Sequence, residues 1–183
     1  MNAARMLSIR WLALLLLPLL MLGCAATSTR NTEARAALPT IAREDMLGNW
    51  YILANVPYFA ERGKVAARVE YVQRSDGRLD DLYYFRRTMD SPEERWEGVA
   101  WALDESGARM KARFIWPFST EFWIIALQQN QQVALIATPD AKLAWVYART
   151  PTIDEASYQA ALARLREFGV DTGTMIRIPQ PAS

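Results

Sequence analysis

The sequence predicts an all-β fold, an eight-stranded up-and-down antiparallel barrel with one α-helix packed on its outside. Between Gly48 and Arg149, short β-type segments alternate with turn signals, and no long helical period interrupts them. About eight such segments are present, the number that closes a barrel with room for one small ligand. After Pro151 the apolar spacing changes to three and four residues, which predicts the helix.

The N-terminal residues have the three-part pattern of an export signal. Arg5 and Arg10 precede the apolar run 11–22, and Gly23 and Cys24 follow it. The run is too short to predict a membrane-spanning helix. Residues 1–23 are therefore expected to be removed as a signal peptide.

Cys24 is the only cysteine of the 183 residues, so it has no intramolecular disulfide partner. Leu22-Gly23-Cys24 resembles the lipobox of bacterial lipoproteins, which implies cleavage before Cys24 and lipidation of that residue. Cys24 is followed by Ala25 and not by an aspartate, and by resemblance this implies that the protein is located at the outer membrane. The lipid would anchor it on the periplasmic face. A cysteine in an uncleaved anchor or in an ordinary secretory signal is the alternative.

The rest of the chain is expected to form one domain. Residues 24–37, rich in Ala, Thr and Ser, are typical of a flexible tether, and residues 38–183 would fold. Lys and Arg total 21 against 20 Asp and Glu, a balance that does not favour nucleic acid as a partner.

The predicted strands lie between turn signals, two of which contain a glycine suited to a positive φ, at 75–77 and 105–107. The predicted strands are 49–56, 67–74, 79–88, 95–103, 108–116, 121–128, 132–138 and 142–149. Alternation along them predicts which side chains line the barrel interior and contact a ligand. The predicted lining residues are Ile52, Ala54, Met110, Ala112, Phe114, Phe122, Ile124, Val133, Leu135, Trp145 and Tyr147.

The predicted helix carries its apolar face on Tyr158, Leu162, Leu165 and Phe168. Upstream, the spacing of Thr152 and Glu155 is that of a capping box, and downstream Gly169 stands where a C-cap glycine belongs. Residues 174–178 are expected to add a short ninth strand.

Several separate motifs resemble the lipocalin family, in particular its bacterial outer-membrane lipoprotein branch, which is related to apolipoprotein D. The segment 144–153, which joins a terminal arginine to the start of the helix, carries the resemblance most strongly. The other matching motifs are Gly48-Asn49-Trp50, Glu61-Arg62-Gly63 and Pro139-Asp140. The resemblance covers about residues 44–181 and implies the lipocalin (calycin) barrel.

Strand direction predicts a contact at the closed end of this barrel. Trp50 opens the first strand, and the eighth strand returns to the same end at Arg149, so the guanidinium can lie across the indole face. The resemblance implies that Gly48, Trp50 and Arg149 have this structural role at the barrel floor.

The opposite end is expected to be open, with aromatic residues in its loops. Arg86 and Arg87 close the third predicted strand at that end, and alternation sends one of them towards the cavity. They are candidates for binding an anionic head group. The alternative is that both are solvated or paired with Glu93 or Glu94.

Composition excludes several kinds of chemistry. The chain has no histidine, which removes histidine-based nucleophilic pairs, zinc sites and haem ligation, and no cofactor or metal is expected. Asp80 and Asp81 point to opposite faces of a strand, so they form no carboxylate pair; one is expected to be solvated and the other to lie near a barrel end.

The leading hypothesis is a non-enzymatic binding protein that stores or transports a small hydrophobic ligand, which the resemblance implies to be a fatty acid or lysophospholipid. Its membrane contact would run through the N-terminal lipid. Two alternatives stay open: a histidine-free enzyme acting on a lipid or polyene, and a structural envelope component with a filled barrel. The sequence also leaves open whether the protein forms a homodimer.

Overall fold

The computed structural model describes residues 37–130 and 132–181. The predicted signal peptide 1–23, the predicted lipidation site Cys24 and all but residue 37 of the predicted tether lie outside these residues. Among the helices of the described part, none is both long and apolar enough to cross a membrane.

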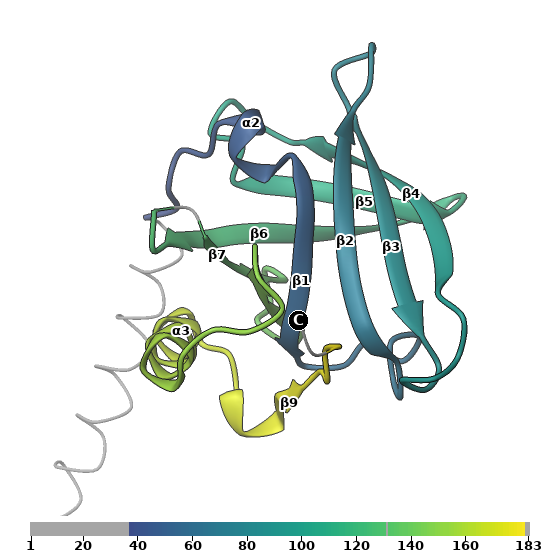
Figure 1. The fold of residues 1–183 in the computed structure, drawn as a ribbon. Coiled ribbons are helices and arrows are strands. Elements are labelled where there is room, and N and C mark those ends of the chain that lie inside the picture. Colours follow the sequence, from purple (N-terminus) through teal and green to yellow (C-terminus); the bar gives the residue numbers. More distant parts are fainter. Residues whose placement is uncertain (1–36, 131, 182–183) are drawn as a thin grey trace, which may run out of the picture.

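Eight antiparallel strands follow one another around a closed barrel, as predicted (Figure 1). Each strand pairs with its neighbour in sequence, and β1 pairs with both β8 and β2, which closes the ring. The strands are β1 (Gly48–Asn55), β2 (Val65–Gln73), β3 (Leu79–Arg86), β4 (Glu94–Ala102), β5 (Arg109–Ile115), β6 (Phe118–Gln128), β7 (Val133–Ala137) and β8 (Ala144–Ala148).

The C-terminal segment completes the seam between β1 and β2. These two strands pair only from Gly48 to Tyr51 on the β1 side, so they separate towards the open end. There β9 (Ile176–Arg177) pairs with the last residues of β1, and the Gln180 side chain donates hydrogen bonds to the backbone carbonyls of Ile52 and Ala67 at 2.9 and 3.0 Å. The predicted ninth strand is thus present, and it fills the gap.

The helix α3 (Glu155–Phe168) lies outside the barrel (Figure 1), and Gly169 ends it with a left-handed φ of 109°. Its N-cap differs from the prediction. Asp154, not Thr152, caps the helix, because the Asp154 carboxylate accepts a hydrogen bond from the Ser157 backbone N–H at 2.8 Å. A short 3-10 turn, η1 (Thr172–Thr174), leads from α3 to β9.

Residues before β1 cover the end of the barrel that carries the β2–β3 turn (Figure 1). The short helix α2 (Arg43–Met46) accepts a hydrogen bond from the Trp50 indole at the Met46 carbonyl, 2.8 Å away. Before α2, the Ile41 amide donates to the Ser106 carbonyl at 2.7 Å. The chain passes close to Gly107 here, because a Cβ at residue 107 would lie 2.2 Å from the Ile41 oxygen. This end is therefore closed.

Arg149 holds the closed end together, and its predicted contact with Trp50 is present. The guanidinium carbon lies 3.7 Å from the centroid of the fully buried Trp50 ring. The same guanidinium donates hydrogen bonds to the carbonyls of Asp45, Leu47 and Asn49 at 2.7 to 2.9 Å. One cation thus donates hydrogen bonds to backbone carbonyls at the C-terminal end of α2 and also packs on the indole.

Candidate ligand-binding cavity

The barrel encloses a cavity of about 690 Å³ that opens between the loops at the end opposite α2. Side chains of β2, β3, β4, β5, β6 and β8 and of the loop after β1 form most of its wall. Most of them are apolar or aromatic, as small-molecule sites usually are. The residues that line it include Val69, Tyr71, Tyr83, Ala112, Phe114, Phe122, Ile136, Leu143, Trp145 and Tyr147.

Five of the predicted lining residues lie on this wall: Ala112, Phe114, Phe122, Trp145 and Tyr147. Ile52, Met110 and Ile124 also point inwards, but they pack in the apolar cluster within the barrel and do not reach the cavity surface. For all eight, contact with a ligand stays a prediction.

The prediction was wrong for Ala54, Val133 and Leu135, which point outwards into the apolar cluster beneath α3. In β1 the register shifts between Ile52 and Ala54, and this irregularity breaks the alternation on which the assignment depended. In β7 the residues on both faces are buried, so the apolar pattern does not show which residues point inwards; these are Ala134 and Ile136.

Asp81 is an acidic residue of the cavity wall whose place the sequence reasoning missed. It lies on the same, inward face of β3 as Leu79, Tyr83 and Phe85, and only 4% of its surface is exposed. Burial, followed by the charge of Glu61, raises the pKa of Asp81 to about 7. The alternation of β3 was the signal that would have placed it inside.

Glu61 is the second acidic residue of the wall, and it comes from the loop after β1. Its carboxylate accepts hydrogen bonds from the Trp145 indole at 3.1 Å and from the Asn55 amide at 3.0 Å. Burial raises the pKa of Glu61, and these hydrogen bonds and nearby Lys64 oppose that rise. No sequence pattern predicts this contact, because Trp145 lies 84 residues away.

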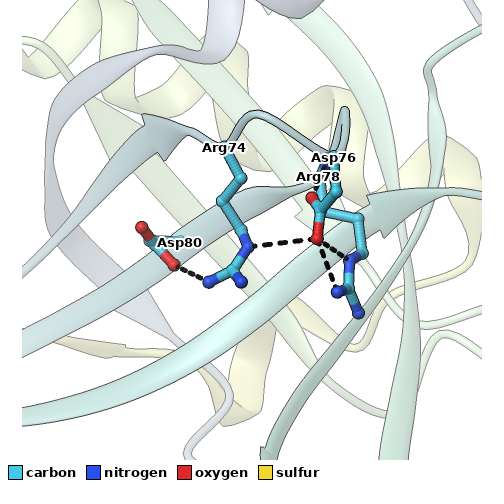
Figure 2. A network of polar contacts seen from close by, with 4 residues as sticks. All are labelled: Arg74, Asp76, Arg78 and Asp80. Carbon is cyan, nitrogen blue, oxygen red and sulfur yellow. Dashed lines mark hydrogen bonds and ion pairs between the residues drawn. The ribbon is translucent and has the colours of Figure 1, made fainter.

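Asp80 lies on the outer face of β3, next to the inward Asp81. Figure 2 shows Arg74 between two carboxylates, with its Nη1 2.6 Å from Asp80 and its Nε 3.5 Å from Asp76, which also pairs with Arg78. The two neighbouring aspartates are thus in different environments, one in an exposed ion-pair network and one in the cavity.

The head-group candidates Arg86 and Arg87 do not line the cavity. The Arg86 guanidinium donates to the Met89 carbonyl at 3.1 Å, and Arg87 forms an ion pair with Glu94 at 2.6 Å. The alternative of pairing with an acidic neighbour therefore holds for Arg87. Strand β3 ends at Arg86, so the alternation that would turn Arg87 inwards no longer applies.

Lys64 is a cation at the mouth of the cavity. Its ammonium lies 3.3 Å from the centroid of the Trp96 ring and 4.0 Å from that of Phe85, and it donates to the Ala60 carbonyl at 2.5 Å. Desolvation lowers the pKa of Lys64. Lys64, Arg62 and Arg87 border a shallow depression of about 360 Å³ beside this mouth.

Exposed apolar side chains surround the open end. Phe59, Ile115 and Phe118 line the mouth with 70% to 76% of their surfaces exposed, and Trp116 beside them is 79% exposed. Such an apolar rim suits contact with a hydrocarbon chain or a membrane surface.

Over residues 37–130 and 132–181, no group of His, Cys, Asp and Glu side chains is arranged to hold a metal ion.

A closed β-barrel with a cavity open at one end and a helix outside defines a class of proteins that hold a small molecule inside the barrel. A family model for the lipocalin-like domain matches residues 43–180. The chain belongs to the lipocalin family, whose members are generally binding proteins for small hydrophobic ligands and not enzymes.

Bacterial lipoproteins are among its relatives in sequence. The chain is 31% identical over 141 residues to the outer membrane lipoprotein Blc of Citrobacter freundii, covering 75% of this chain and 78% of that protein. It is 26% identical over 176 residues to Blc of Vibrio cholerae, covering 93% and 99%. These relatives support the outer-membrane, lipid-anchored localisation that the N-terminal residues predict.

Solved structures of similar fold include lobster apocrustacyanin A1, with a TM-score of 0.62 and 14% sequence identity over 76% of this chain and 80% of that chain. Insecticyanin from the tobacco hornworm Manduca sexta has a TM-score of 0.61 and 15% identity over 80% and 83%. At these identities the likeness extends to the fold alone.

Proposed function

We propose that this protein binds a single-chain lipid, a fatty acid or a lysophospholipid, and stores or transports it at the outer membrane. The observation that supports this proposal is the cavity of about 690 Å³, which has a largely apolar wall and opens between the loops at the end opposite α2. Each methylene group that moves from water into such a wall contributes about 0.8 kcal/mol, so a long chain binds well without specific contacts.

The distribution of charge favours an anionic head group at the mouth and not at depth. Glu61 and Asp81 lie inside and would repel a carboxylate or phosphate, whereas Lys64, Arg62 and Arg87 surround the depression outside. A lipid of this class would therefore enter tail first, and its charged end would stay near water.

Calorimetric titration with dodecanoate and dodecanol below their micellar concentrations tests the proposal. We expect both to bind, and Ala112→Trp, which fills the cavity, to weaken both at least tenfold. Ala102→Trp is the control, because Ala102 is exposed near the closed end of β4. Absence of binding by either probe to the folded protein contradicts the proposal.

The membrane anchor needs its own test, and Cys24 is the residue to change. We expect Cys24→Ala to move the protein from the membrane fraction to the soluble fraction or to leave its signal uncleaved. A correctly cleaved Cys24→Ala protein that stays in the membrane fraction would contradict lipid anchoring.

A further inference from the structure

The cavity has a polar group at depth that a fatty acid would not use. Asp81 lies three residues into β3 from the turn at the closed end, opposite Tyr71 of β2 and Gly98 of β4. Its side chain reaches the cavity wall and is 4% exposed. A tail-first lipid would place its hydrocarbon end against this carboxyl group.

Asp81 has no hydrogen-bond donor among the described residues. Glu61 differs, because Trp145 and Asn55 both donate to it. A buried carboxylate without donors is costly, and natural proteins rarely leave one unless it has a function. Asp81 is therefore a polar group without a partner that faces an open space.

Among the described residues, no cation pairs with Asp81. Its charged neighbour is Glu61, which has the same sign, and the hydroxyls of Tyr71 and Tyr147 interact with it electrostatically. The two cations nearest the cavity have other partners: Arg95 pairs with Glu97, and Lys64 lies over Trp96, donates to Ala60 and interacts with Glu61. The interior thus has a negative potential that a ligand cation would neutralise. The titratable and charged groups that line this space are Glu61, Tyr58, Tyr71, Tyr83, Arg95, Glu97 and Tyr147.

We propose that the cavity also binds apolar amines, with the ligand's ammonium group on the Asp81 carboxylate and its hydrocarbon part towards the mouth. Charge-assisted hydrogen bonds from an ammonium group to a carboxylate are among the stronger ones, and they strengthen where water is excluded. Glu61 adds a second negative charge above the site. The apolar rim of Phe59, Ile115 and Phe118 then contacts the hydrocarbon part.

This orientation is opposite to that of the proposed lipid. A fatty acid keeps its carboxylate at the mouth beside Lys64, whereas an amine places its charged end at depth. The inference rests on the proposed function only because both need the cavity to accept a hydrocarbon chain. Selectivity among chains of equal length therefore separates the two proposals.

The test compares dodecylamine, dodecanol and dodecanoate below their micellar concentrations at pH 8, by calorimetric titration of the full folded domain. We expect dodecylamine to bind at least tenfold more tightly than dodecanol. Asp81→Asn should remove this advantage and leave the affinity for dodecanol within about twofold, because the amide has the size of the carboxyl group but no charge. Asp80→Asn is the matched control, since Asp80 lies on the outer face.

The pH dependence gives a second readout. Because the pKa of Asp81 is raised to about 7, an ammonium ligand must remove a proton from it at lower pH. We expect the affinity for dodecylamine to rise about tenfold from pH 6 to pH 8 in the wild type and to rise much less in Asp81→Asn, which loses the Asp81 carboxyl group and keeps Glu61.

The outcomes are distinct. If dodecanol and dodecanoate bind but dodecylamine gains nothing over dodecanol, or if Asp81→Asn leaves its advantage intact, the amine site is wrong and the lipid proposal stands. If no probe binds, both fail. Should Asp81→Asn not fold, Asp81→Leu removes the charge in an apolar form, and the same loss of the amine's advantage is expected.

Discussion

The two apolar clusters on either side of the barrel wall differ in how they are filled. Outside, beneath α3, side chains such as Leu135, Val146, Leu165 and Phe168 are fully buried and pack against one another. Inside, the wall surrounds a cavity of about 690 Å³ and includes the carboxyl group of Asp81. Strands β7 and β8 contribute to both clusters, so one pair of strands separates a solid core from a hollow one.

This difference indicates where the free energy of folding comes from. Close packing without voids gives the outer cluster the dispersion and burial terms of an ordinary core. The inner cluster surrounds a cavity, so it gains less dispersion and burial energy, and it also contains a buried acidic group, which is costly. We therefore expect substitutions beneath α3 to change stability and substitutions on the cavity wall to change binding.

The largest expected effect tests this separation directly. Phe168→Ala removes a fully buried ring that packs edge-on against Trp123, and it should lower the free energy of unfolding by about 3–5 kcal/mol. Phe114→Ala removes a ring that is 40% exposed at the cavity and should cost about 1 kcal/mol or less. Urea denaturation of both variants measures the difference.

Binding should show the reverse order. Folded Phe168→Ala should keep the wild-type affinity for dodecanol, whereas Phe114→Ala should weaken it several-fold. Equal losses of stability in the two variants, or loss of binding in folded Phe168→Ala, would contradict the separation of the two clusters.

The second effect is a pH dependence that arises in the inner cluster alone. The pKa of Asp81 is about 7 in the folded protein against 3.8 for a free side chain, so the folded state holds a proton that the unfolded state has released between these values. The free energy of unfolding therefore falls as the pH rises from about 4 to 7. The slope is about 1.4 kcal/mol per pH unit, and the total is a few kcal/mol.

Asp81→Asn should remove most of this slope and leave a protein that is more stable than the wild type at pH 8. The raised pKa of Glu61 adds a contribution of the same sign, which the variant retains. Urea midpoints of the two proteins from pH 4 to pH 8 give the result. Parallel curves would mean that Asp81 is ionised in the folded protein throughout this range.

The same contrast explains what could be predicted from the sequence. Strand β3 has one buried and one half-buried face, and its regular alternation identifies the inward side chains, Asp81 included. Strand β7 is buried on both faces, so the pattern of Val133 and Leu135 does not say which side is which. The fold followed from strand number, turns and the C-terminal helix, all of which are local signals.

The cavity needed information that no local pattern contains. Glu61 reaches the wall because its loop folds back to β8, and Ala54 turns outwards because of a register shift within β1. By contrast, Trp50 and Arg149 were paired correctly across the whole barrel, since strand direction alone brings both to one end. Long-range contacts are thus predictable where topology determines them and not where a loop conformation does.

The third effect extends the comparison to the closed end, which is packed like the outer cluster. Arg149→Met removes the cation and its hydrogen bonds, and Trp50→Leu removes the ring. Because the two variants lose the same cation–π contact, their effects should combine less than additively, with a coupling of about 0.5–2 kcal/mol. Urea denaturation of the single and double variants measures it, and full additivity would rule out the contact. The affinity of Arg149→Met for dodecanol should not change.

The smallest effect is expected at Asp80, and it decides whether the environment or the residue type makes Asp81 special. Asp80 and Asp81 are adjacent in β3 and have the same side chain, but Asp80 pairs with Arg74 in an exposed network (Figure 2). Exposed ion pairs are screened by water and salt and contribute little to stability. Asp80→Asn should therefore leave the urea midpoint within experimental error, keep the wild-type slope between pH 4 and pH 7, and keep the preference for dodecylamine. A change in that slope or preference as large as that of Asp81→Asn would mean that the charge of the strand, and not the buried position of Asp81, is responsible.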